Sequence, residues 1–145
     1  MALLLTLDAS VFVAACRRSE AGHASSRALL DSLAGTDVPL IEPALLPVEV
    51  AATLSRTGVD AALAQDFAEA ILDLPHLTVV AVDERLIRRA ITAATQHKLR
   101  GSDALYITVA AQYGARLVTL DSEQLRRAPA VLGACKPDTA AALLH

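Results

Sequence analysis

Short apolar runs alternate along the chain with segments of helical periodicity, and two of these runs end at an aspartate. Residues 3–7 are apolar or β-branched throughout and lead directly into Asp8. A run this short and this apolar predicts a strand buried on both faces, as in a parallel sheet. Residues 117–120 repeat the pattern and lead into Asp121. The two runs therefore predict strands of one sheet whose carboxyl ends deliver two aspartates to the same edge.

The remaining segments continue this alternation. Apolar residues at helical spacing, bounded by prolines and turn residues, predict helices over 10–16, 22–33, 47–57, 60–74, 83–94 and 101–114. Short apolar or β-branched runs predict further strands over 38–41, 77–82 and 130–134. Strands that alternate with helices favour a parallel sheet covered on both faces. The predicted fold is thus α/β, a three-layer α/β/α sandwich with a roughly five-stranded parallel sheet, in one domain over 1–145.

Composition narrows the function less than the pattern does. Aromatic residues make up only 3% of the chain, which argues against an aromatic stacking platform for single-stranded nucleic acid. The net charge of −3 is slightly acidic, but its distribution matters more than its sum. If four of the 16 acidic residues hold a metal, the 13 Lys and Arg residues balance the others. The charge therefore excludes no class of substrate.

The chain also lacks the sequence marks of secretion and of membrane insertion. Cys16 and Cys135 are far apart and form no C-x-x-C pattern, and no signal peptide precedes the first strand. No stretch approaches the roughly 20 apolar residues that span a bilayer. We therefore expect a cytoplasmic protein with reduced thiols and no membrane partner.

Four acidic residues are candidates for chemistry. Asp8 and Asp121 end strands, whereas Glu49 and Asp103 fall in the first turns of predicted helices. Each acid taken alone is explained equally well by capping or by a favourable interaction with a helix N-terminus. Glu42 also ends a predicted strand and is the alternative to Glu49.

The order and spacing of these acids resemble the PIN domain, and in detail the VapC-type ribonuclease toxins of prokaryotic toxin–antitoxin pairs. The segments that carry the resemblance are 7–10 (LDAS), 49–54 (EVAATL), 102–106 (SDALY) and 118–121 (VTLD). It implies a five-stranded parallel sheet, a divalent metal bound by the acids, and a cognate antitoxin as partner. It also implies that the hydroxyls of Ser10 and Thr119 support the site. After the last acid, family members often carry a basic or aromatic pair, where this chain has Ser122-Glu123-Gln124-Leu125.

The chemistry of the acids agrees with that resemblance. Carboxylate oxygens suit Mg²⁺ or Mn²⁺, hard ions that also bind phosphate oxygens. A metal held in this way activates water for attack on a phosphodiester bond, so no histidine base is needed. His23, His76, His97 and His145 show no metal-ligand spacing, and we expect them to be surface or packing residues. We therefore expect a Mg²⁺- or Mn²⁺-dependent endoribonuclease that forms a homodimer. We also expect that no Lys or Arg within the four segments neutralises the acids, so that at least one acid has a raised pKa without metal.

Several assignments stay open at this point. Arg17, Arg18, Lys98 and Arg100 are candidates for gripping RNA phosphates, and ordinary solvated helix ends explain them equally well. Tyr106 is expected to serve core or dimer packing. A non-toxin PIN nuclease of RNA processing and a catalytically silent, protein-binding PIN scaffold are the alternative functions. A phosphatase with an aspartate nucleophile is disfavoured because Ser10 stands where it usually has a second aspartate.

Overall fold

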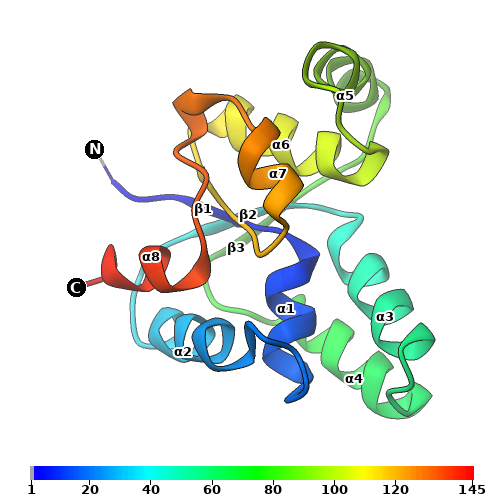
Figure 1. Cartoon of the computed structure of the whole chain (residues 1–145), viewed down its shortest axis with the longest axis vertical. Helices are drawn as coiled ribbons and strands as arrows, with labels where there is room; N and C mark the ends of the chain where they lie inside the picture. The colour runs from blue at the N-terminus through cyan, green and yellow to red at the C-terminus, as the bar shows by residue number, and fades with distance from the viewer. Residues whose placement is uncertain (1) are drawn as a thin grey trace.

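The computed structural model describes residues 2–145 and, within them, places a four-stranded parallel sheet between two layers of helices (Figure 1). The strand order is β3-β2-β1-β4. The strands are β1 (Leu5–Leu7), β2 (Leu40–Pro43), β3 (Leu77–Val80) and β4 (Arg116–Val118). The predicted α/β/α class and the parallel sheet are confirmed.

The order in which the chain adds strands to the sheet reverses between β1 and β4. From β1 the chain adds β2 and β3 on one side and later adds β4 on the other side. Leu7 pairs with Val118, and the backbone N–H of Asp8 donates to the Val118 carbonyl at 2.9 Å. The carboxyl ends of these two strands therefore lie next to each other, at the kind of switch point where open α/β sheets bind ligands.

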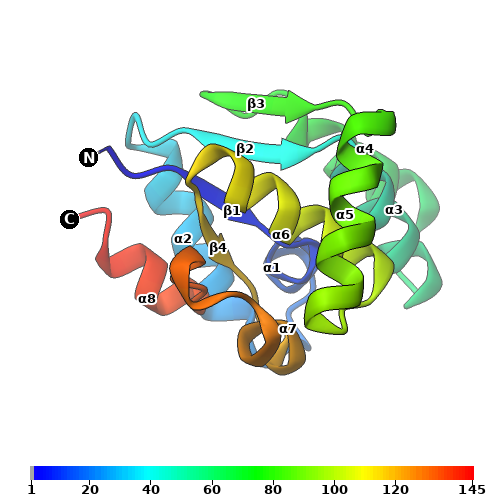
Figure 2. The ribbon, with the colours of Figure 1, turned by 90° about the horizontal axis from the view of Figure 1, so that it is seen from above.

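Helices cover both faces of the sheet. They are α1 (Ala9–Cys16), α2 (His23–Ala34), α3 (Leu46–Arg56), α4 (Ala61–Ile71), α5 (Glu84–His97), α6 (Gly101–Tyr113), α7 (Ser122–Arg127) and α8 (Pro137–Ala142). Figure 1 shows α5, α6 and α7 on one side of the sheet and α1, α2 and α8 on the other. Viewed from above, the arrows of β2 and β3 point toward α3, α4 and α5, so these three helices stand near the carboxyl ends of the strands (Figure 2). None of the helices in residues 2–145 is long and apolar enough to cross a membrane.

Aliphatic residues build the core, as the scarcity of aromatic residues predicts. Leu5, Leu7 and Leu117 are fully buried in the central strands. Helices α1 and α6 are buried on most sides, and Phe12 and Tyr106 are the largest of their fully buried side chains. Burying one large apolar side chain stabilises the fold by about 1.5–3 kcal/mol. The two helices packed most firmly into the core are therefore the ones that begin at the switch point.

The predicted fifth strand over 130–134 is wrong. Residues Ala130–Leu132 form a 3₁₀-helix, η1, and Gly133 then takes a left-handed conformation with φ of 57°. Pro129 before η1 has no backbone N–H to give to a ladder. Beyond η1, Cys135 forms an isolated bridge to Val118 of β4 and does not extend the sheet as a strand. Cys16 and Cys135 are both free.

Candidate active site

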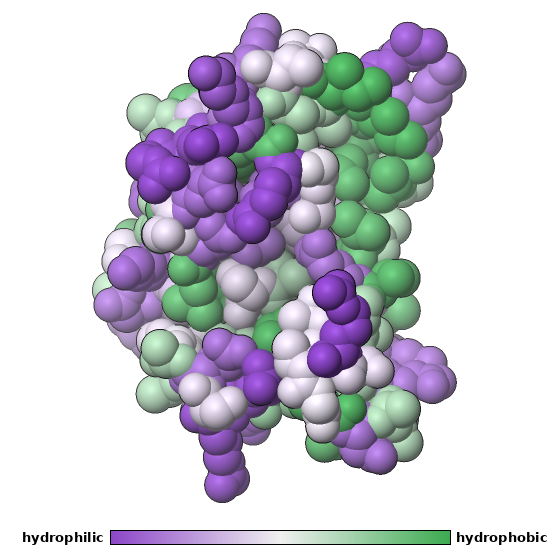
Figure 3. Space-filling view, turned by 45° about the vertical axis from the view of Figure 1, so that its right-hand side comes forward, coloured by the Kyte–Doolittle hydropathy of each residue, from purple (hydrophilic) through white to green (hydrophobic). Residues whose placement is uncertain are grey.

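A pocket of about 480 Å³ opens at the carboxyl ends of β1 and β4. It contains all four acids that the sequence singled out, together with Ser10 and Arg100. Its walls are Asp8, Ala9, Ser10, Val13, Ala14, Glu20, Glu49, Thr53, Arg100, Ser102, Asp103, Leu120 and Asp121. Figure 3, which turns this side of the molecule forward, shows hydrophilic side chains gathered over the upper part of the face and a hydrophobic band along its right-hand margin.

Asp8 is fixed by two hydroxyl groups. It caps α1 and is 6% exposed, and its Oδ2 accepts from the hydroxyls of Ser10 at 2.6 Å and Thr119 at 2.9 Å. The same hydroxyl oxygens accept backbone N–H groups, Ser10 Oγ from Leu120 at 3.1 Å and Thr119 Oγ1 from Asp121 at 3.0 Å. The structure thus brings Ser10 and Thr119 to Asp8, and they tie the strand-end segments of β1 and β4 together.

Burial is the main influence on the ionisation of Asp8. Loss of solvent raises its pKa above the ordinary value, and the hydroxyls of Ser10 and Thr119 counter only part of that rise. The negative charge of Glu49 raises the pKa further. All the hydrogen bonds to this carboxylate within the described residues reach Oδ2, which leaves Oδ1 for a ligand.

Asp121 and Asp103 share one arginine. Asp121 caps α7, where its Oδ1 accepts from the N–H groups of Glu123 at 2.8 Å and Gln124 at 3.1 Å. Its Oδ2 accepts from Nη2 of Arg100. Arg100 Nε donates to Asp103 Oδ2 at 3.0 Å. The four segments themselves supply no basic residue, as expected, but Arg100 lies two residues before the 102–106 segment and pairs with two of the acids.

The two aspartates respond differently to this environment. Burial raises the pKa of Asp103, the Arg100 guanidinium lowers it, and the charges of Asp8 and Asp121 raise it again, with a net rise. Burial also tends to raise the pKa of Asp121. The hydrogen bonds from the Gln124 N–H and from Arg100 outweigh burial, so the pKa of Asp121 is lowered. A raised acid pKa without metal was expected, and the structure attributes it first to burial and only then to the neighbouring charges.

Glu49 is held by a buried tyrosine. The phenol of Tyr106 donates to Glu49 Oε1 at 2.6 Å, and burial followed by the charge of Glu49 raises the pKa of Tyr106, so the phenol stays protonated. The sequence interpretation placed Tyr106 only in packing and missed this role. The available signal was its spacing, because a residue three positions after Asp103 lies on the same helix face.

Glu42 lies beneath the pocket and does not line it. It is 1% exposed in β2, where its Oε2 accepts from the backbone N–H of Leu7 at 2.8 Å. Its Oε1 has no partner among the described residues. Burial raises the pKa of Glu42 well above its ordinary value, and the charge of Asp8 adds to the rise. Glu42 therefore favours the neutral form, whereas Glu49 is the glutamate that faces the pocket.

The candidate RNA-contacting residues are dispersed. Of the four, only Arg100 lines the pocket. Arg17 pairs with Glu20 at 2.7 Å, and Arg18 and Lys98 are exposed outside the pocket. The guanidinium of Arg100 pairs with Asp103 and Asp121 of the pocket.

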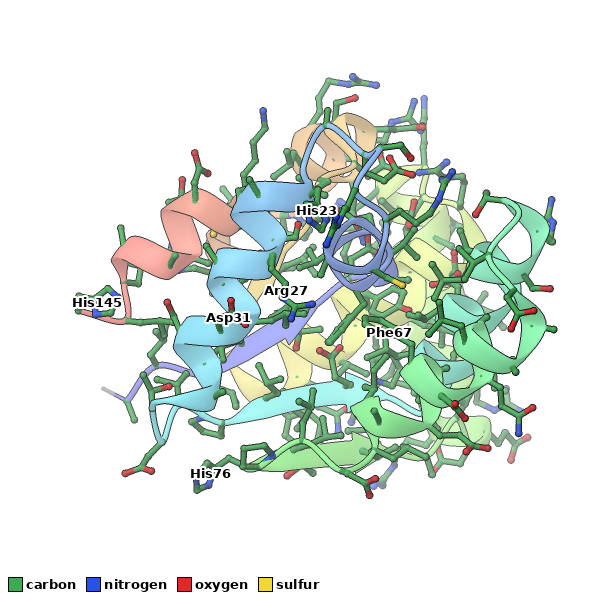
Figure 4. The ribbon with its side chains drawn as sticks, turned by 90° about the horizontal axis from the view of Figure 1, so that it is seen from below. His23, Arg27, Asp31, Phe67, His76 and His145 are labelled. Atoms are coloured by element: carbon green, nitrogen blue, oxygen red, sulfur yellow. The ribbon has the colours of Figure 1, made fainter. Side chains whose placement is uncertain are left out.

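Histidines are absent from the pocket lining among residues 2–145. His23 lies against α1, where its Nδ1 is 2.8 Å from the Ala14 carbonyl. Figure 4 shows His76 beside β3 and His145 at the chain end, both well away from His23. These three residues agree with the surface or packing roles expected from the sequence.

The donor set of the pocket suits a hard divalent ion, because the four candidate acids and Glu20 open into one cavity. No three His, Cys, Asp or Glu side chains of residues 2–145 converge closely enough to hold a metal ion in the arrangement observed. The Arg100 guanidinium lies between Asp103 and Asp121 and occupies one oxygen of each. The residues therefore fit a divalent ion in chemistry.

The model of the PIN domain matches residues 5–130, and the chain belongs to the PIN domain family. No curated protein matches the chain in sequence.

Solved structures share this fold at low sequence identity. PAE2754 from Pyrobaculum aerophilum is 24% identical, with a TM-score of 0.71 over 99% of this chain and 90% of that one. VapC20 of Mycobacterium tuberculosis, a toxin that cleaves the sarcin–ricin loop, is 19% identical, with a TM-score of 0.72 over 84% of this chain and 93% of that one. VapBC2 from Rickettsia felis, bound to a promoter DNA fragment, is 16% identical, with a TM-score of 0.67 over 92% and 98% of the respective chains. The structural neighbours thus include toxin–antitoxin proteins.

Replacing Glu42 with glutamine should stabilise the protein at neutral pH. The raised pKa means that the folded state binds more protons than the unfolded chain, so stability falls as the pH rises from about 4.3 through the folded-state pKa. Glutamine cannot ionise and still offers an oxygen to the Leu7 N–H. We expect Glu42→Gln to raise the melting temperature at pH 7.5 by roughly 3–6 °C, with a smaller gain at pH 4.

Thermal melts across this pH range, with the exposed Glu69→Gln as a matched control, measure the effect. A variant that melts below the wild type at pH 7.5 would show that Glu42 is ionised and paired in the folded state.

Proposed function

We propose that the protein is a Mg²⁺- or Mn²⁺-dependent endoribonuclease. The observation that carries the proposal is the convergence of Asp8, Glu49, Asp103 and Asp121 on one pocket at the β1/β4 switch point. Buried carboxylates are costly unless a cation or hydrogen bonds compensate them. Membership of the PIN domain family supports the same assignment.

In this proposal Asp8, Asp103, Asp121 and Glu49 hold the metal. Such an ion, when bound, lowers the pKa of water and stabilises charge on a phosphate. Ser10 and Thr119 keep Asp8 oriented with Oδ1 free. Tyr106 keeps Glu49 oriented by donating a hydrogen bond from its hydroxyl group. The N–H groups of α7 hold Asp121 at Oδ1. Asp8, Glu49 and Asp121 are therefore each oriented by their own hydrogen bonds, and orientation of reacting groups contributes to catalysis.

The proposed substrate is RNA, hydrolysed at its phosphodiester bonds. Support comes from the family and from the fold shared with VapC20, a toxin that cleaves the sarcin–ricin loop. Helix α7 begins with Ser122 and Glu123 directly after Asp121, and Glu123 pairs with Arg127 at 3.2 Å. This chain therefore lacks the basic or aromatic pair expected there, and contacts to RNA must come from other parts of the rim.

We further propose that the protein is a cytoplasmic toxin, a homodimer held inactive by a cognate antitoxin. Several structural neighbours are toxin–antitoxin complexes, which supports such a partner. The hairpin of α3 and α4 offers an apolar groove of about 410 Å³, and Val48 and Leu72 in its wall are 66% and 53% exposed. An amphipathic helix of a partner fits a groove of this kind. A non-toxin PIN nuclease and a silent scaffold are the alternatives.

RNA cleavage should depend on metal and on the strand-end aspartates. Asp8→Asn and Asp121→Asn each keep the side-chain shape while removing one charged ligand, so we expect each to lower the cleavage rate by at least roughly 100-fold. Cleavage of total RNA with Mg²⁺ or Mn²⁺, and with EDTA, measures this. Asp73→Asn, at an exposed position after α4, should keep full activity. Undiminished cleavage in EDTA, or by both site variants, would contradict the proposal of a metal-dependent nuclease.

Expression of the wild-type chain alone should arrest bacterial growth, because an unrestrained ribonuclease destroys RNA that the cell needs. The Asp8→Asn variant should leave growth unchanged, and a small co-encoded protein should relieve the arrest. Growth curves with sequencing of RNA ends after brief induction test the proposal. Unchanged growth and RNA during expression of a demonstrably active enzyme would favour the non-toxin nuclease instead.

A further inference from the structure

One cation of the protein itself sits among the acids of the pocket. The guanidinium of Arg100 donates from Nε to Asp103 and from Nη2 to Asp121, reaching Oδ2 of each. The three side chains differ in exposure, at 57% for Arg100, 9% for Asp103 and 27% for Asp121. The arginine thus enters the pocket from the solvent side and meets two less exposed carboxylates.

The backbone around Arg100 is anchored to the same part of the molecule. Lys98 ends α5 in a left-handed conformation with φ of 54°, and its carbonyl accepts from Nη1 of Arg127 on α7. Arg100 then forms the N-cap position of α6 without a side-chain cap of its own. The short connection between α5 and α6 is therefore tied to α7 at two points, one through Arg127 and one through Asp121.

At Asp121, the oxygen that Arg100 uses is the one that a metal would need. Oδ1 of Asp121 already accepts two N–H groups of α7, which leaves Oδ2 as the oxygen that can turn toward an ion. Arg100 occupies that Oδ2, and it occupies Oδ2 of Asp103 as well. A guanidinium and a divalent ion cannot share these oxygens without bringing two positive charges within a few ångströms.

We propose that Arg100 is a built-in counter-ion that competes with the divalent metal for Asp103 and Asp121. In the metal-free protein it offsets the repulsion among the acids, and metal binding displaces it toward the pocket mouth. The inference rests on the proposed metal-dependent function and adds a cost to metal binding that the acids alone would not impose. Arg100 is a positioning residue in this account, because it acts on the metal through the two aspartates.

The competition predicts opposite effects of one substitution with and without metal. Arg100→Gln removes the positive charge, so Mn²⁺ should bind at least about 10-fold more tightly in isothermal titration calorimetry. In EDTA the same variant should melt below the wild type, because its acids have lost their counter-ion. The rise in melting temperature on adding Mn²⁺ should be larger than in the wild type, since ligand stabilisation follows affinity.

Two further variants keep the test specific. Arg88→Gln breaks an exposed pair with Glu84 on α5, so it removes a positive charge without touching the pocket, and its Mn²⁺ affinity should equal that of the wild type. Arg100→Lys keeps the charge but loses the guanidinium fork that reaches both aspartates, so it should bind Mn²⁺ more tightly than the wild type and less tightly than Arg100→Gln. The comparison of Arg100→Lys with the wild type decides the proposal if the glutamine variant fails to fold.

Equal Mn²⁺ affinity in Arg100→Gln, Arg100→Lys and wild type would overturn the competition while leaving the metal site intact. An absence of Mn²⁺ binding in every variant would instead overturn the proposed function and the competition together. The titrations need no RNA, so they do not depend on finding the right substrate.

Discussion

The fold brings several carboxylates to one end of a parallel sheet, and the rest of the site depends on how their burial and mutual repulsion are offset. A pair of carboxylates about 4 Å apart would repel by about 4 kcal/mol at an effective dielectric near 20, and the repulsion weakens with distance. Asp8 and Asp103 are also buried, which adds the loss of solvation. The sheet topology brings Asp8 and Asp121 to the same edge, because β1 and β4 are neighbours and their carboxyl ends face the same way.

Each acid has its own means of compensation. Hydroxyl groups hold Asp8, a phenol holds Glu49, helix N–H groups hold Asp121, and one arginine joins Asp121 to Asp103. All these partners donate hydrogen bonds, so they favour the charged carboxylates without neutralising the whole group. A pocket with several negative charges and one displaceable cation is suited to a divalent ion and, through that ion, to a phosphate.

The sequence was informative where a feature is local. Apolar runs and periodicity predicted the sheet and its helices, and four acids at strand ends and helix starts identified the pocket. The fifth strand failed because Pro129 and Gly133 favour a turn that a short apolar run does not reveal. Helical spacing places Arg100 and Tyr106 near Asp103, which lies three positions from each. It does not identify their distant partners, because the contacts of Arg100 with Asp121 and of Tyr106 with Glu49 span 21 and 57 positions. Such pairings follow from the packing of α6 and from nothing in its own periodicity.

A crystal structure with Mn²⁺, phased or checked by anomalous scattering, tests the central claim that these acids form a metal site. The account predicts an anomalous peak in the pocket at roughly 2.0–2.4 Å from oxygens of Asp8 and Asp121, with the guanidinium of Arg100 no longer on Asp121. A crystal soaked to saturation that shows no peak in the pocket, with Arg100 still joined to both aspartates, would contradict it.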